Sequence, residues 1–281
     1  MNEEGVTMSL FAVDQEKCKR DGVCVAECPM GIIELKRENS VPTPTRDAEK
    51  LCINCGHCVA VCPHGAFSLG TMTPGQCKMV QSDWLLEPAH VEHFLHTRRS
   101  IRTYKERPVK REILTKLIDI ARFAPSGHNT QPVRWLVIYD SDEVRHLAGL
   151  VIDWMRQMTK KQDPVAKAMH MPRIVHAWET GIDRICRGAP HVIVTHAPKE
   201  DGRAPAACTI ALNYLELAVP SFGLGACWAG YFNTAANLWP AMQASLALPE
   251  GHISFGAMMV GYPTFRYQRI PLRNEARVTW R

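Results

Sequence analysis

Long apolar runs are missing from this chain of 281 residues. No uninterrupted apolar stretch reaches about 18 residues, so we expect no membrane-spanning helix. The amino-terminal MNEEGVTMSL is acidic and has no long apolar core, which argues against a secretory signal peptide. GLGACW, residues 223–228, has only two of the three glycines of a dinucleotide-binding fingerprint and follows a predicted helix. These absences favour a protein of the reducing cytoplasm that has no dedicated Rossmann motif.

Cysteine is concentrated near the amino terminus. LCINCGHCVAVCP, residues 51–63, places Cys52, Cys55, Cys58 and Cys62 in the spacing C-x2-C-x2-C-x3-C-P. In this spacing three thiolates bind one iron–sulfur cube, and the cysteine before proline binds the other cluster of a two-cluster protein. A second copy of the motif is therefore expected nearby.

That second copy is CKRDGVCVAECP, residues 18–29, in which Asp21 stands where the second cysteine belongs. The rule for the fourth cysteine predicts two sets of metal ligands. The first cluster would be held by Cys28, Cys52, Cys55 and Cys58. The second would be held by Cys18, Cys24 and Cys62, with Asp21 at the remaining corner.

Three outcomes are open at Asp21. The carboxylate binds the fourth iron as a hard ligand, or that iron is lost and [3Fe–4S] remains, because thiolate suits this iron better. Alternatively, Asp21 only caps a turn before Gly22. We therefore expect one 4Fe–4S cluster and one that is 4Fe–4S or 3Fe–4S. Zinc sites usually use well-separated ligand pairs, and disulfides need an oxidising compartment, so both fit this pattern less well.

Residues 9–72 resemble a bacterial-type dicluster ferredoxin. We expect a ferredoxin-type domain at residues 1–72, a linker at 73–90 and a second domain at 91–281. The formal charge of +5 counts cysteines as neutral. Two clusters with their thiolates would bring the loaded protein close to neutrality. The apparent basicity is therefore no sign of nucleic-acid binding.

Helices and strands alternate irregularly in the second domain. KREILTKLIDIARFA, residues 110–124, places apolar residues on one helical face, and residues 206–222 form a mostly apolar helix. VRWLVIYD, HVIVTHA and HISFGAMMVGYP are typical of buried strands. HVEHFLH, residues 90–96, is expected to be a surface helix rather than a metal site. We predict an α+β fold for this domain.

Three polar stretches stand out in the second domain. They are RRSIRTY at 98–104, APSGHNTQP at 124–132 and GYPTFRYQRIPLR at 261–273. Arginine offers a planar fork of donors that suits phosphate, whereas serine, asparagine and glutamine can bond a polyol or an amide-rich ring. Together they predict a site for an anionic, hydroxylated cofactor.

These stretches, in this order, resemble the nitroreductase family of flavoproteins. The resemblance covers about residues 91–281 and implies an α+β homodimer with FMN at the subunit interface. The resemblance places three groups of residues around the flavin. The phosphate and ribityl end would be bound by Arg98, Arg99, Ser100, Arg102 and Arg269, with Arg266 as a further candidate. The neighbouring subunit would supply Pro125, Ser126, Gly127 and Asn129, and the backbone of Ala229 and Gly230 would face the reactive edge of the flavin.

The combination of the two domains implies an FMN- and iron–sulfur-dependent oxidoreductase. Electrons would pass from a reduced ferredoxin or similar donor through the clusters to FMN, and then to an electron-poor acceptor such as a nitroaromatic, quinone or activated alkene. No side chain stands out as an acid–base catalyst, in keeping with chemistry carried by the cofactor. An alternative is an electron-transfer flavoprotein that serves a protein partner and has no small substrate of its own.

Overall fold

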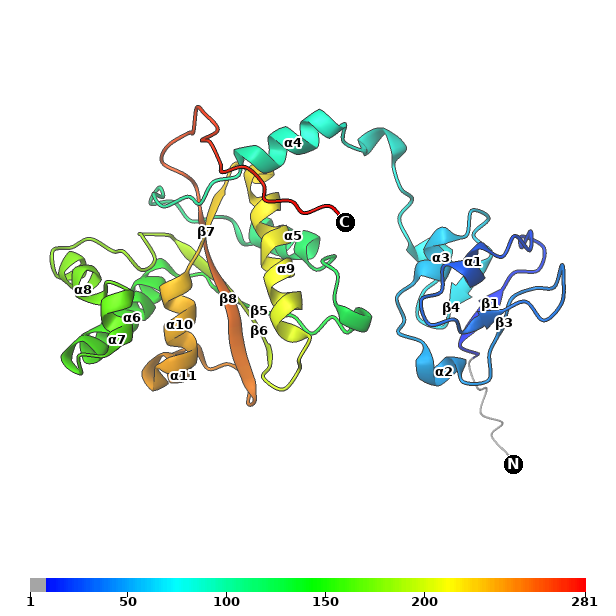
Figure 1. Ribbon diagram of the computed structural model, residues 1–281, viewed down its shortest axis with the longest axis horizontal. Coiled ribbons are helices and arrows are strands. Elements are labelled where there is room, and N and C mark those ends of the chain that lie inside the picture. Colours follow the sequence, from blue (N-terminus) through cyan, green and yellow to red (C-terminus); the bar gives the residue numbers. More distant parts are fainter. Residues whose placement is uncertain (1–8) are drawn as a thin grey trace. The chain divides into compact units, whose positions relative to one another are not determined.

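The computed structural model describes residues 9–281 (Figure 1). Residues 1–8, which include most of the acidic segment that argues against a signal peptide, lie outside the described residues. The chain forms two compact units. One contains the residues up to Leu85 together with 128–130, and the other contains 86–127 and 131–281. The break at Leu85 lies inside the segment expected to be a linker, whereas the grouping of 128–130 with the first unit was not expected.

The first unit has two small antiparallel sheets and three short helices. Strand β1 (Phe11–Val13) pairs with β4 (Phe67–Leu69), and β2 (Ile33–Glu34) pairs with β3 (Thr43–Pro44). The helices are α1 (Val23–Ala26), α2 (Ala48–Leu51) and α3 (His57–Val61). The rings of Phe11 in β1 and Phe67 in β4 lie 4.5 Å apart and belong to the hydrophobic core of this unit. Cys24 and Cys58 are buried in the same core, so the cysteine-rich loops form part of it.

The two cysteine motifs have the same local backbone. Helix α1 begins after Gly22, at φ 73°, and helix α3 begins after Gly56, at φ 74°. This left-handed conformation is readily adopted by glycine. Asp21 directly precedes one of these glycines and Cys55 precedes the other. The structure therefore supports the alignment of Asp21 with a cysteine position of the motif.

The second unit is built on an antiparallel sheet of four strands in the order β5–β6–β8–β7. Their bounds are Arg134–Ile138 for β5, His191–Pro198 for β6, Gly225–Trp228 for β7 and His252–Gly261 for β8. Ser100 forms an isolated parallel bridge to Ala226 of β7, and Tyr104 bridges Pro263 beyond β8. The RRSIRTY segment therefore runs alongside the edge of the sheet.

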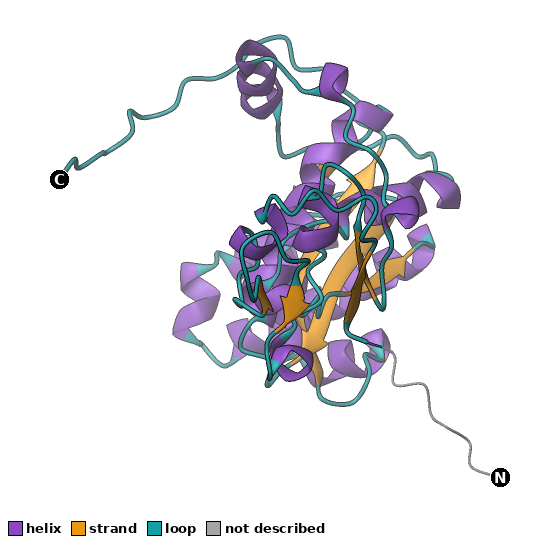
Figure 2. Cartoon of the chain, turned by 90° about the vertical axis from the view of Figure 1, so that its right-hand side faces the viewer, coloured by secondary structure: helices purple, strands orange, loops and turns teal. Residues whose placement is uncertain are grey.

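Helices cover both faces of this sheet (Figures 1 and 2). Because side chains alternate along a strand, Ile193 and Met258 pack on one face with α5 and α9, whereas Val192 and Met259 pack on the other with α6 and α10. The helices are α4 (Pro88–Thr97), α5 (Arg111–Ala121), α6 (Ser141–Lys160), α7 (Pro164–Ala168), α8 (Met171–Glu179), α9 (Ala204–Ala218), α10 (Gly230–Leu238) and α11 (Pro240–Leu246).

The elements expected in this unit are confirmed. The periodic helix is α5, the apolar helix is α9, and the expected strands are β5, β6 and β8. HVEHFLH lies in α4, whose side chains are mostly exposed, and GLGACW ends one helical segment and enters β7. The α+β expectation is therefore correct. Among residues 9–281, no helix is both long and apolar enough to cross a bilayer.

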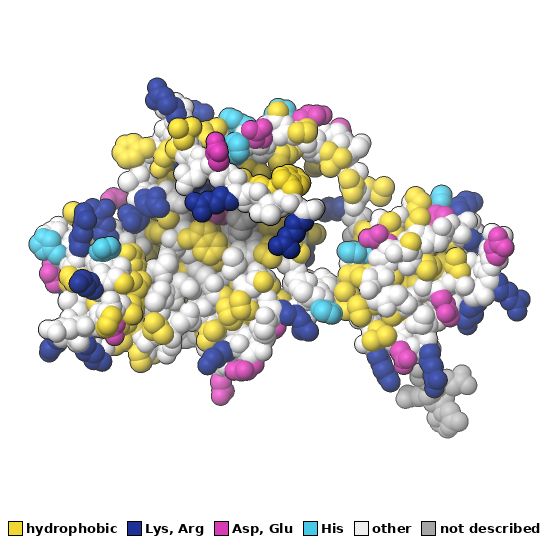
Figure 3. All heavy atoms as spheres, in the orientation of Figure 1, with side chains coloured by type: hydrophobic (Ala, Val, Ile, Leu, Met, Phe, Trp, Pro, Cys, Tyr) yellow, Lys and Arg dark blue, Asp and Glu magenta, His cyan; other side chains and the backbone are white. Residues whose placement is uncertain are grey.

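One face of the molecule carries charged side chains of both signs. On the face shown in Figure 3, lysine and arginine are interspersed with aspartate and glutamate in each unit.

Candidate functional site

The first unit brings four cysteines from the two motifs to one cavity. Cys28 of the earlier motif lines it together with Cys52, Cys55 and Cys58 of the later motif. The other walls are largely apolar and include Phe11, Ile33 and Leu69. We call this the first cysteine cavity. Its cysteines are the set expected for the first cluster.

A second cavity in the same unit groups the remaining motif residues. Cys18, Asp21, Cys24 and Cys62 all line it, and His64 lines it as well. The sulfur of Cys62 accepts a hydrogen bond from the backbone N–H of Ala66 at 3.3 Å. We call this the second cysteine cavity. His64 follows the Cys-Pro pair directly, and sequence reasoning gave it no role.

Both carboxylate oxygens of Asp21 face other groups of this loop. Oδ1 accepts the N–H of Val23 at 3.3 Å, which is the capping role considered for this residue. Oδ2 lies 3.8 Å from Nε2 of His64, and both side chains are half-exposed. Asp21 therefore stabilises the turn that leads into α1 and also approaches an imidazole at the cavity wall.

The cysteines of this chain are present as free thiols. All 11 are free of disulfides. Within residues 9–281, no three side chains of histidine, cysteine, aspartate or glutamate converge on one ion. An iron–sulfur cube needs no such convergence, because each thiolate binds a different iron. Burial raises the pKa of Cys24 and raises that of Cys58 to about 12. A metal that deprotonates its thiol ligands outright overcomes this preference for the neutral form.

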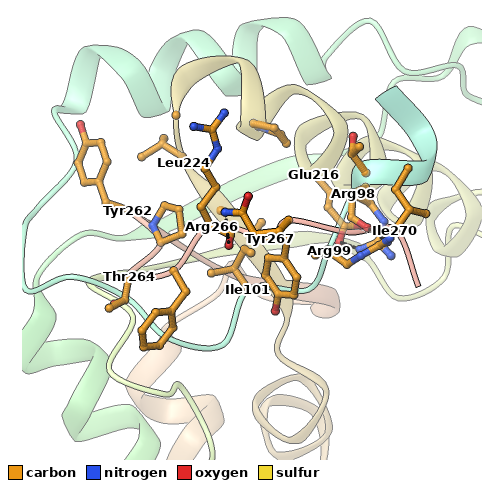
Figure 4. Close-up of a pocket in the computed structure, with 18 of the residues that line it drawn as sticks. Arg98, Arg99, Ile101, Glu216, Leu224, Tyr262, Thr264, Arg266, Tyr267 and Ile270 are labelled. Atoms are coloured by element: carbon orange, nitrogen blue, oxygen red, sulfur yellow. Dashed lines mark hydrogen bonds and ion pairs between the residues drawn. The ribbon is translucent and has the colours of Figure 1, made fainter. Parts of the chain in front are cut away.

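The second unit contains a large pocket of about 1180 Å³ next to the RRSIRTY segment. Arg98 and Arg99, near the start of the unit's sequence, line this pocket. Arg266 and Arg269, from its carboxy-terminal segment, line it as well. Figure 4 shows Arg98 and Arg99 beside Glu216, with Arg266 and Tyr267 entering from the carboxy-terminal segment. We call this the arginine pocket. Its size and its concentration of guanidinium groups suit a large anionic ligand.

Glu216 of helix α9 fixes one side of the arginine pocket. Its side chain is only 5% exposed, and Oε1 accepts a 2.7 Å hydrogen bond from Nη1 of Arg98. Oε2 accepts a 3.1 Å bond from Nε1 of Trp228, at the end of β7. The positive charge of Arg98 is thus already compensated within the chain. Sequence reasoning missed Glu216, whose only signal is a lone acidic residue in an apolar helix.

Arg99 offers an unsatisfied donor in the same pocket. Its Nη1 donates to the backbone oxygen of Arg98, whereas its Nε is buried and has no partner. A buried N–H without an acceptor is costly. Phosphate oxygens are suitable acceptors for a guanidinium, so Arg99 fits the phosphate end of a flavin nucleotide.

Ser100 and Arg102 do not line the arginine pocket. Both influence the buried thiol of Cys227 on β7. Burial raises the pKa of this thiol, and the charges of Arg102 and Arg187, with a hydrogen bond from Ser100, partly offset the effect. The polar side chains of the RRSIRTY segment thus lie in two places: Arg98 and Arg99 line the arginine pocket, whereas Ser100 and Arg102 lie near Cys227.

The APSGHNTQP loop has contacts of its own. Oγ of Ser126 accepts the N–H of Gln131 at 2.9 Å. The side-chain amide of Asn129 donates to the carbonyl oxygens of Ile53, at 3.3 Å, and Asn54, at 2.9 Å. Of the residues expected from the neighbouring subunit, none (Pro125, Ser126, Gly127, Asn129) lines the arginine pocket of this chain.

Ala229 and Gly230 mark the junction between β7 and α10. The N–H of Ala229 bonds to the oxygen of Ala257 at 2.8 Å and is therefore used within the sheet. Gly230 begins α10, where the first N–H groups have no acceptor in the helix. A Cβ built on Gly230 would meet nothing within 4 Å. Of the two, Gly230 is better placed to offer its N–H to a ligand.

Comparison with known proteins agrees with this division. The model of the nitroreductase family matches residues 95–262, and that of a 4Fe-4S dicluster domain matches residues 11–67. An *Archaeoglobus fulgidus* protein, provisionally named an NADH dehydrogenase/NAD(P)H nitroreductase, is 26% identical over 174 residues, or 60% of this chain and 83% of that protein. An NADH dehydrogenase of *Thermus thermophilus* is 28% identical over 200 residues, or 66% and 92% of the two chains.

A solved structure has the fold of the second unit. The nitroreductase with bound FMN from *Bacteroides fragilis* superposes with a TM-score of 0.56 at 19% identity, covering 67% of this chain and 98% of that one. At this identity the likeness concerns the fold. The family model, in contrast, spans more than half of the chain. The chain therefore belongs to the nitroreductase family, and a 4Fe-4S dicluster domain precedes its nitroreductase domain.

Proposed function

We propose that this protein is an FMN- and iron–sulfur-dependent oxidoreductase whose clusters deliver electrons to the flavin. A reduced ferredoxin or a similar one-electron donor would load the clusters. The final acceptor would be an electron-poor small molecule, such as a nitroaromatic, a quinone or an activated alkene. The observation that carries the proposal is the presence of two cysteine-lined cavities and an arginine pocket in a single chain.

The two cysteine cavities support an assignment of the cluster ligands. Cys28, Cys52, Cys55 and Cys58 would hold a 4Fe–4S cluster in the first. Cys18, Cys24 and Cys62 would hold three corners of the second cluster, next to Asp21. The grouping of cysteines across the two motifs supports this assignment, because the rule for the fourth cysteine requires it.

The flavin would be bound through the arginine pocket. Arg99 and Arg269 would bind the phosphate, Arg98 would support it from its pairing with Glu216, and Gly230 would offer its N–H at the reactive edge. The structure of the *B. fragilis* nitroreductase contains FMN, which supports the choice of cofactor. Bound FMN supplies both one- and two-electron chemistry, and the protein contributes binding, orientation and exclusion of water.

A homodimer would complete the flavin site, with Ser126 and Asn129 supplied by the neighbouring subunit. The carboxy-terminal segment supports a partner, because Leu272 is 98% exposed and Trp280 is 91% exposed in the single chain. Large apolar side chains in such positions commonly mark a protein interface.

A nicotinamide is the main alternative electron donor. The *T. thermophilus* relative is named an NADH dehydrogenase, which favours direct reduction of the flavin by NADH. Anaerobic reduction of the purified protein by NADH, NADPH or reduced ferredoxin, followed in the flavin spectrum, separates the two donors. We expect ferredoxin to reduce the flavin much faster. Faster reduction by NADH, with no response to ferredoxin, would contradict the proposed path.

A further inference from the structure

The second cysteine cavity contains a fifth residue able to bind metal. We propose that His64 binds the fourth iron of the second cluster and that Asp21 orients its imidazole. The proposal rests on the proposed function, since it requires a cluster in this cavity. It differs from all three outcomes left open by the sequence, in which Asp21 binds the iron, the iron is lost, or Asp21 only caps a turn.

The carboxylate of Asp21, which lines the cavity, has two other neighbours in the structure. It occupies the position of a cysteine, directly before the left-handed Gly22. Its Oδ1 is engaged by the N–H of Val23, two residues further on, at 3.3 Å. Its other oxygen faces His64, at 3.8 Å from Nε2. The carboxylate therefore has a turn to stabilise on one side and an imidazole to orient on the other.

His64 has the chemistry that the corner lacks. Imidazole is a better ligand for iron than carboxylate, and histidine replaces cysteine on one iron of some iron–sulfur centres. A metal-bound histidine usually donates its other N–H to a carboxylate, which fixes the ring. Because Nε2 is the nitrogen nearest Asp21, Nδ1 is left for the iron. Binding uses the lone pair of a neutral ring, so no electron is transferred in this step.

The chain contains a matched control. Nδ1 of His57 lies 3.8 Å from Oε1 of Glu27, and both side chains are half-exposed. His57 lines the first cysteine cavity, where four cysteines are already present. The same type of histidine–carboxylate pair therefore occurs next to a cavity with a complete set of thiols, where no further ligand is needed.

The test is pulsed EPR on the reduced holoprotein with histidine labelled by ¹⁵N. Labelling only histidine separates a ligand from the backbone N–H groups that surround every cluster. We expect a strong histidine-nitrogen coupling in the wild type and in His57→Ala, and its loss in His64→Ala. In Asp21→Asn we expect the coupling to persist with an altered orientation. His64→Cys should lower the potential of the second cluster, because a thiolate adds negative charge.

The possible failures are distinguishable. Two clusters per chain without a histidine-nitrogen coupling, or the same coupling in His64→Ala, would overturn the assignment of His64 and leave the proposed function intact. Iron analysis of the same samples tests whether the second cluster is present at all. A wild-type protein with no iron–sulfur cluster in the second cavity would overturn both the ligand and the cluster-to-flavin path.

Discussion

Arg98 forms an ion pair with the buried Glu216 at the edge of the arginine pocket, with 2.7 Å between Nη1 and Oε1. The carboxylate also accepts a bond from Trp228, which leads into the junction with α10. One buried side chain thus connects the RRSIRTY segment with the strand that ends at the expected reactive edge of the flavin. Arg98 is consequently a structural residue as well as a proposed phosphate ligand.

The first prediction concerns the stability of this pair. Glu216→Gln keeps the shape of the side chain, but its amide N–H₂ would face at least one of the two donors, Arg98 or Trp228. The free energy of unfolding should therefore fall by about 3 kcal/mol. Urea unfolding at a fixed, saturating FMN concentration measures the change. Asp119→Asn is the matched control, because Asp119 and Arg122 are also 2.7 Å apart but are exposed. That loss should stay below about 1 kcal/mol. Equal losses in both variants would show that burial does not matter here.

The second prediction concerns Arg99 and Arg269, the two arginines proposed to bind the phosphate. Arg99→Ala and Arg269→Ala should each remove a charge-assisted hydrogen bond and weaken FMN binding by about 1.5–3 kcal/mol, or roughly ten- to a hundredfold. Quenching of flavin fluorescence gives the dissociation constants. Arg122→Ala, which removes an exposed arginine outside the pocket, should bind FMN normally. Unchanged affinity in both pocket variants would place the phosphate elsewhere.

The third prediction concerns pH. His191 is fully buried, and its Nε2 accepts the N–H of Val109 at 2.8 Å while Nδ1 lies 2.7 Å from the oxygen of Tyr139. Burial, the largest effect, lowers the pKa of His191 below its ordinary 6.5. The unfolded chain therefore takes up a proton first, and stability should decrease as the pH falls below about 6.5.

Measuring wild type and His191→Gln at several pH values isolates this effect. Glutamine does not titrate, so the stability advantage of the wild type should shrink as the pH falls from 7.5 towards 5. A constant difference between the two proteins over this range would mean that His191 is not held neutral by the fold.

The fourth prediction concerns the exchange of cysteines between motifs. Cys28→Ala should destroy the cluster held by Cys52, Cys55 and Cys58, although Cys28 belongs to the other motif. Cys62→Ala should destroy the cluster that contains Cys18 and Cys24. Iron content and EPR of the reduced proteins should show one remaining cluster in each variant, with different spectra. Cys77→Ala, outside both cavities, should retain both. Loss of the same cluster in both variants would exclude the exchanged arrangement.

Sequence patterns anticipated the parts of the molecule that depend on local regularity. The spacing of apolar residues in α5 and the apolar runs of β6 and β8 follow from how a helix or strand meets a core. The two cysteine sets follow from spacing as well, because a cluster requires ligands at fixed separations.

Contacts between distant segments were not predictable in this way. Glu216 meets Arg98 across 118 positions of sequence, and nothing near either residue identifies the other. Asn129 was expected to face a flavin, whereas its amide also bonds to the carbonyl oxygens of Ile53 and Asn54. His64 likewise became a candidate ligand only because the folded loop places it, together with Asp21, in the lining of the second cysteine cavity.

Rapid-mixing reduction of the cluster variants tests the central claim most directly. Reduced ferredoxin is mixed anaerobically with wild type, Cys58→Ala and Cys77→Ala, each with FMN bound, and the flavin absorbance is followed with time. We predict rapid flavin reduction in wild type and Cys77→Ala, and at least a tenfold slower reaction in Cys58→Ala. Equal rates in all three proteins would contradict the account, because electrons would then reach the flavin without the clusters.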